Sequence, residues 1–156
     1  MTTRAVEPWT LQPLVDFVRE ASVRLVLLMT PAGQVLAQSG FSRAVDVMSA
    51  AALGAAIMAS MTELAKQLGQ PPFAGLNHQG SRHGIFLSGL TSHRGPIVAL
   101  AVYELDVSSL GLVQLFFEQL AGDLKAAAPK DSVPKKVLAA DFERELSESL
   151  STLFGR

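Results

Sequence analysis

The sequence has 156 residues, of which 49% are hydrophobic and 17% charged, and its formal net charge is −1 at pH 7. This length fits one domain with a short extension, and the near-neutral charge argues against nucleic acid as a partner. The absence of cysteine excludes disulfides and thiolate chemistry, so we expect a cytoplasmic protein, and the high apolar content favours an oligomer.

The first part of the chain predicts a helix followed by a hairpin. Apolar residues recur at helical spacing between Thr10 and Ser22. Branched residues then fill Val23 to Met29, the turn-forming residues Thr30 to Gly33 follow, and Gln34 to Gln38 forms a second short strand.

A long helix is expected from about Ala44 to Leu68. We expect its core side to be a stripe of residues three or four apart, namely Ala50, Leu53, Ile57, Met61, Leu64 and Leu68. Gly69, with two prolines behind it, ends the helix. The uncharged run Val47 to Thr62 is too short for a membrane span, so no integral membrane association is expected.

Three antiparallel strands and a third helix are expected next. The strands are Leu76 to Arg82, Gly84 to Leu90 and Pro96 to Val107. Ser108 or Ser109 caps the helix, which keeps its apolar period up to Leu124. The order αββαβββα predicts an α/β (α+β) sandwich with a five-stranded antiparallel sheet between helices.

The end of the chain predicts a separate element. We divide the sequence into a domain over 1–126, a linker over 127–137 that is rich in proline, small and charged residues, and an amphipathic helix over 138–156. Four of its apolar residues are the expected contacts with a partner: Phe142, Leu146, Leu150 and Phe154.

Four segments of sequence carry a resemblance to a known family: ELAKQLGQPPF (63–73), HQGSRHGIFLS (78–88), SSLGLVQL (108–115) and SLSTLFGR (149–156). Together with the element order, they resemble the Roadblock/dynein light chain family, and within it the bacterial MglB-like regulators of a Ras-like GTPase. The resemblance implies a Roadblock-type fold, a homodimer and a small Ras-like (MglA-like) GTPase as partner.

The side of the long helix opposite the expected core stripe is the candidate binding surface. It carries small residues where an ordinary surface helix carries charges, so a partner can approach closely. Helix propensity alone is the competing explanation. The resemblance implies that paired long helices receive the GTPase, and the candidate contacts are Met48, Ala52, Ala55, Ala59, Thr62, Glu63 and Lys66.

The polar strand that begins at Leu76 would be an unprotected edge in a monomer, and pairing with a second copy would cover it. The candidate dimer residues are Asn77, His78, Gln79, Gly80 and Ser81. The alternative is that this segment is a loop.

No sequence pattern predicts a catalytic site, a metal or a cofactor. The histidines, His78, His83 and His93, match no zinc spacing, and the chain has no phosphate-binding loop motif. Arg94 stands where a hairpin tip is expected, and an activator can insert such an arginine into a GTPase. A solvated turn explains Arg94 better, and the resemblance implies activation without an arginine finger.

Two functions from different classes therefore remain open. The first is a regulator that stimulates GTP hydrolysis on a small GTPase in cell polarity or motility, without a catalytic site of its own. The second is a dimeric adaptor that binds without stimulation. A small-ligand sensory domain is less favoured, because no polar residues converge on an apolar pocket.

Overall fold

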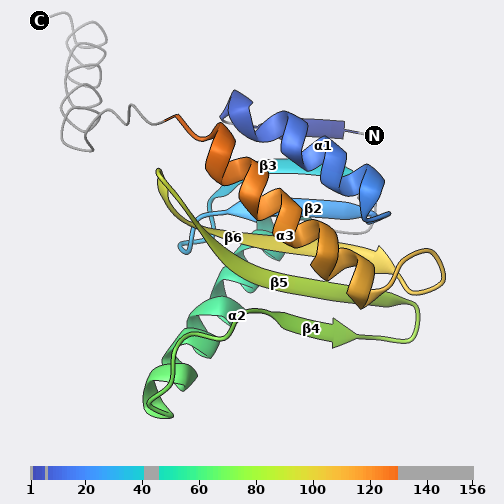
Figure 1. Cartoon of the computed structure of the whole chain (residues 1–156). Coiled ribbons are helices and arrows are strands. Elements are labelled where there is room, and N and C mark those ends of the chain that lie inside the picture. Colours follow the sequence, from blue (N-terminus) through green and yellow to red (C-terminus); the bar gives the residue numbers. More distant parts are fainter. Residues whose placement is uncertain (1, 6, 41–45, 130–156) are drawn as a thin grey trace, which may run out of the picture.

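The computed structural model describes residues 2–5, 7–40 and 46–129 (Figure 1). In chain order its elements are β1 (Thr2–Ala5), the 3-10 turn η1 (Pro8–Thr10), α1 (Leu11–Glu20), β2 (Leu25–Met29), β3 (Val35–Gly40), α2 (Val47–Gln67), β4 (Leu76–Gln79), β5 (His83–Ser92), β6 (Gly95–Glu104) and α3 (Leu110–Ala127). The predicted order αββαβββα is confirmed, and β1 is an additional strand that the sequence did not predict.

The strands form one antiparallel sheet in the order β1-β3-β2-β6-β5-β4. The five predicted strands are all present, and β1 extends the sheet by pairing with β3. Strand β4 is shorter than expected, because Gly80 and Ser81 lie in the turn before β5, where the Gly80 amide donates to the His83 carbonyl at 2.8 Å. The long β5–β6 hairpin reverses at its tip between Ser92 and Gly95.

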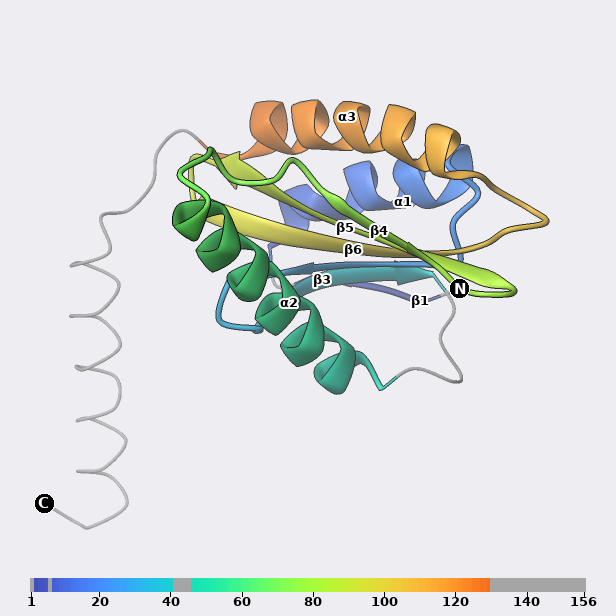
Figure 2. The same cartoon turned by 90° about the horizontal axis from the view of Figure 1, so that it is seen from below.

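Helices cover the two faces of the sheet unequally, as Figure 2 shows. Helices α1 and α3 lie side by side on one face, and α2 lies across the other. The α1–α3 side holds the larger core, in which Phe86 of β5 meets Phe117 of α3 edge-on with ring centroids 5.2 Å apart. The α2 side holds a smaller core around Leu27, Leu87 and Leu100.

Helix α2 has a well-defined start and end. The Asp46 carboxylate accepts hydrogen bonds from the Met48 amide at 3.1 Å, the Ser49 amide at 3.4 Å and the Ser49 hydroxyl at 2.8 Å, and the Ser49 bonds above all lower the pKa of Asp46. At the other end Gly69 has φ +66°; its amide donates to the Lys66 carbonyl, and the Gln70 amide donates to the Ala65 carbonyl, each at 3.0 Å. The predicted glycine stop is confirmed.

The third helix begins where expected, because the Ser109 hydroxyl accepts from the Leu112 amide at 3.3 Å. It continues to Ala127, three residues beyond the predicted end at Leu124. The predicted C-terminal helix, with Phe142, Leu146, Leu150 and Phe154, lies outside the described residues, as does most of the linker. The division into domain, linker and terminal helix therefore stays a prediction.

Candidate protein-binding site

Helix α2 packs against the sheet with a side that is turned about a quarter turn from the one expected. The side chains it buries are small: Ala51, Gly54, Ala55 and Ala65. Leu53 and Leu68, which we expected in the core, are 65% and 62% exposed, and Ile57 and Leu64 are about half exposed. The prediction that the large apolar residues form the core stripe is wrong, and so is the expectation that Ala55 faces away from the sheet.

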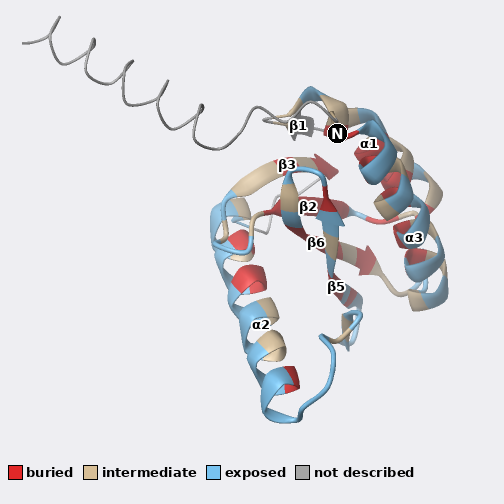
Figure 3. Ribbon diagram, turned by 60° about the vertical axis from the view of Figure 1, so that its left-hand side comes forward, coloured by how far each residue is buried: buried red, intermediate tan, exposed pale blue. Residues whose placement is uncertain are grey.

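The physical reason is the close approach of helix and sheet. A Cβ added to Gly54 would lie 3.5 Å from the thioether of Met29, which is fully buried on β2. A Cβ added to Gly33, whose φ is +90°, would lie 3.3 Å from the Cα of Ala52. Larger side chains on this side of α2 would push the helix away, so the large residues lie on its exposed sides. In Figure 3 most of the α2 ribbon is coloured as exposed, with a few separate buried positions.

A groove runs between the C-terminal half of α2 and the β5–β6 hairpin. Its volume is about 540 Å³, within the roughly 300–1,000 Å³ of typical ligand pockets. Half-buried apolar side chains form much of its lining, among them Met58 from α2, Phe73 from the loop before β4, and Leu90 from β5. We call this the α2 groove.

Five of the seven predicted contact residues line the α2 groove: Ala55, Ala59, Thr62, Glu63 and Lys66. Ala59, Glu63 and Lys66 are exposed, whereas Ala55 is only 5% exposed and mainly contacts the sheet. The other two, Met48 and Ala52, are exposed near the start of the helix and do not line the groove. Whether these residues bind a GTPase stays a prediction.

Sequence reasoning missed the walls of the groove that do not come from the helix. These residues come from the β2–β3 turn, the loop before β4 and the β5–β6 hairpin: Pro31, Pro72, Phe73, Ala74, Gly89, Leu90, Thr91, Pro96, Ile97 and Val98. Pro72 and Phe73 stood in the recognised segment 63–73, but only the prolines of that segment were interpreted, as part of the helix stop. Only the topology brings the hairpin to the helix.

A second unpartnered surface lies on another flank of α2. It consists of Leu53, Ile57, Leu64 and Leu68, and we call it the outer stripe. Successive helical residues are about 100° apart, so Ile57 and Ala59 point to roughly opposite flanks. Among the described helices α2 alone is long and apolar enough to cross a membrane, a test of length and composition only, and only 17% of that stretch is buried. Its exposed apolar surface calls for a partner.

Strand β4 lies at an edge of the sheet, as expected for the proposed dimer contact. Of the five predicted residues, Asn77 and His78 lie in β4 with Gln79, and Gly80 and Ser81 follow it in the turn. The hydroxyl of Tyr103 crosses β5 above Gly84 and donates to the Asn77 side-chain oxygen at 2.8 Å. This bond holds the edge strand from the core side.

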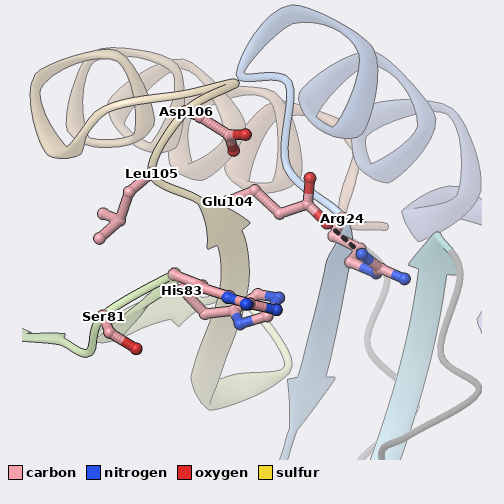
Figure 4. Close-up of a pocket in the computed structure, with 7 residues that line it drawn as sticks. Arg24, Ser81, His83, Glu104, Leu105 and Asp106 are labelled. Atoms are coloured by element: carbon pink, nitrogen blue, oxygen red, sulfur yellow. Dashed lines mark hydrogen bonds and ion pairs between the residues drawn. The ribbon is translucent and has the colours of Figure 1, made fainter.

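A second cavity, of about 690 Å³, lies at the opposite end of the β5–β6 hairpin (Figure 4). Its lining residues are Arg24, Ser81, Arg82, His83, Glu104, Leu105 and Asp106. The Arg24 guanidinium forms an ion pair with the Glu104 carboxylate. Charges of both signs line the cavity, so it selects no particular ligand charge.

No protein-family model and no curated protein sequence matches the chain. Solved structures do match it. Myxococcus xanthus MglB is similar with a TM-score of 0.65 and 25% identity, over 71% of this chain and 87% of that chain. An MglB with a tetrameric arrangement gives a TM-score of 0.65 and 28% identity, over 75% and 85% of the two chains. A Roadblock/LC7 domain from Streptomyces avermitilis shares the fold, with a TM-score of 0.63 and 10% identity over 73% and 92%.

The chain has the Roadblock fold. It is MglB-like, because the likeness to MglB structures combines the fold with 25–28% identity. The described fold of this Roadblock chain corresponds to most of the length of the MglB chains it matches.

The hairpin-tip arginine of this Roadblock protein is held by the N-terminal turn. Arg94 contacts the Glu7 carboxylate at 3.4 Å, and the other oxygen of Glu7 accepts from the Trp9 indole at 2.6 Å. The histidines His78, His83 and His93 are exposed. Within the described residues, no group of three metal-ligating side chains lies close enough together to hold a metal ion.

Proposed function

We propose that this protein is a homodimeric Roadblock regulator that binds a small Ras-like, MglA-like GTPase and stimulates its GTP hydrolysis without an arginine finger. The protein itself supplies no catalytic group, and we place it in the cytoplasm. Its similarity to MglB supports a role in a GTPase pathway, and cell polarity or motility is the process we propose.

The observation that carries the proposal is that α2 presents two separate unpartnered surfaces. The α2 groove is bordered by the hairpin and by exposed Ala59, Glu63 and Lys66, so a projecting part of a GTPase can enter it. The outer stripe lies on another flank and remains available for a second copy of the chain. One helix can therefore serve both partners at the same time.

Two exposed surfaces that a second copy of the chain could bury support the homodimer. The outer stripe exposes four large apolar side chains, and β4 exposes the polar edge of the sheet. A two-fold interface made from both would bury apolar surface and continue the sheet across the axis. The tetrameric arrangement of a similar MglB is consistent with assembly.

A mechanism without an inserted arginine is supported by the positions of the candidate arginines. Arg94 is engaged by Glu7 on the α1–α3 side of the hairpin tip. Arg82 lies at the far end of the hairpin from the α2 groove. We therefore propose that binding orders the GTPase's own catalytic groups.

The experiment is single-turnover GTP hydrolysis by an MglA-like GTPase, with and without the protein, alongside a binding measurement on the GTP-loaded form. Faster turnover supports the proposal. Binding with unchanged turnover contradicts stimulation and favours the alternative, a non-stimulating dimeric Roadblock adaptor. Absence of binding to either nucleotide state contradicts both.

A further inference from the structure

The α2 groove is a largely apolar surface that is exposed to water when neither a partner nor another segment of the chain occupies it. Its volume of about 540 Å³ and its half-buried Met58, Phe73 and Leu90 suit a few large apolar side chains of an incoming segment. At its border the exposed side chains of Glu63 and Lys66 carry opposite charges. An amphipathic segment with an apolar stripe and charged neighbours would fit this lining.

The chain leaves the described fold at the same end of the molecule as the groove. Helix α3 ends at Ala127, and Figures 1 and 2 both place this end beside the β5–β6 hairpin tip and toward the end of the molecule where α2 finishes. The hairpin itself forms one wall of the groove. From Pro129 the nine steps to Leu138 span at most about 30 Å of extended chain, enough to pass around the hairpin.

The sequence beyond this point has the required chemistry. Leu138, Phe142, Leu146 and Leu150 recur every four residues, which in a helix makes one apolar stripe. Residues 138–156 contain four acidic and two basic residues, so the segment has charges of both signs beside its apolar stripe, as the groove border has in Glu63 and Lys66. An amphipathic helix seated in an apolar groove is a common mode of peptide recognition.

We propose that residues 138–156 dock in the α2 groove of their own chain when the GTPase is absent. The regulatory consequence rests on the proposed function, because a GTPase that uses the groove must first displace the segment.

The first test uses disulfide cross-linking in the full chain, which is favourable because the protein has no cysteine of its own. Ala59→Cys places a thiol in the groove, and Ser149→Cys places one seven residues after Phe142, on the same side of the predicted helix. The matched control replaces Ala59→Cys by Ser60→Cys, an adjacent exposed position that does not line the groove. Under mild oxidation we expect an intramolecular cross-link for the first pair and at least tenfold less for the control.

Equal cross-linking of both pairs, or none with the groove pair, would overturn the proposal. A cross-linked species of twice the chain mass would overturn docking within the same chain, because it shows that the segment reaches a second protomer. This test needs no GTPase, so its failure leaves the proposed function standing.

The second test measures regulation with point variants in the full chain. Leu146→Glu puts a carboxylate into the apolar stripe, whereas Ser151→Glu adds the same charge on the opposite side of the predicted helix. If the segment fills the groove about nine-tenths of the time, removing it strengthens apparent GTPase binding about tenfold. We expect this gain for Leu146→Glu and no change for Ser151→Glu. Weaker binding of Leu146→Glu, or the same gain in both variants, would contradict the inference.

Discussion

Replacing Leu53 by Glu is expected to separate the proposed dimer without unfolding the chain. Leu53 lies in the outer stripe with 65% of its surface exposed, so a charge there costs the isolated fold little. Full burial of a leucine contributes about 1.5–3 kcal/mol, and the exposed part represents about 1–2 kcal/mol. A two-fold interface contains the residue twice, so we expect a loss of about 2–4 kcal/mol, or a dimer Kd raised roughly 30- to 1,000-fold.

The assay is the mass in solution over a concentration series, by light scattering or sedimentation, with far-ultraviolet circular dichroism to check the fold. The matched control is Ala56→Glu, which adds the same charge to α2 at an exposed position outside both the outer stripe and the groove. A variant of Leu53 that remains as dimeric as the control would refute the reasoning. So would a wild-type chain that is monomeric and binds lipid vesicles through α2.

Four further substitutions test the site and the fold. Ala59→Arg should keep the fold and weaken GTPase binding by about 2 kcal/mol or more. Ala55→Arg should instead lower the melting temperature, because Ala55 is packed against the sheet. Equal stability of the two variants would contradict the packing of α2. Gly84→Ala should cost about 1–3 kcal/mol of unfolding free energy in denaturant titration, because its Cβ would lie 2.3 Å from the ring of buried Tyr103; a neutral result would place that ring elsewhere. Arg94→Ala should leave stimulated GTP hydrolysis within a few-fold of wild type, and a loss of about 10³-fold would identify an arginine finger after all.

The elements of the fold could be predicted because the sequence marks their ends with residues of special backbone or capping chemistry. Gly69 adopts the left-handed conformation that stops α2, and Ser109 caps α3 through its hydroxyl. The turn at Gly33, with φ +90°, joins the predicted β2–β3 hairpin. These signals are local, so one sequence is sufficient to read them.

The α2 groove could be predicted only in part, because one of its walls depends on how distant segments are arranged and not on a local signal. Periodicity grouped Ala59, Thr62, Glu63 and Lys66 on one side of α2, and they do lie together along the groove. The facing wall comes from the β5–β6 hairpin, and its approach to α2 depends on strand order and on how the helix crosses the sheet. No local pattern in the hairpin, including the alternation that leads to Leu90, carries that information.

The rotated orientation of α2 follows from two demands on one helix, close packing on the sheet and contact with a second molecule. Hydrophobicity alone assigns the largest residues to the core, and for α1 this is correct, since Leu14 and Phe17 are buried there. Helix α2 instead meets the sheet through Gly54 and small neighbours, because the sheet side is already filled by residues such as Met29. Its leucines then remain on the outside, where burial requires a second molecule. A helix with small residues on one side and large apolar residues on another is therefore better explained by close packing within the chain and assembly outside it than by a single core-facing stripe.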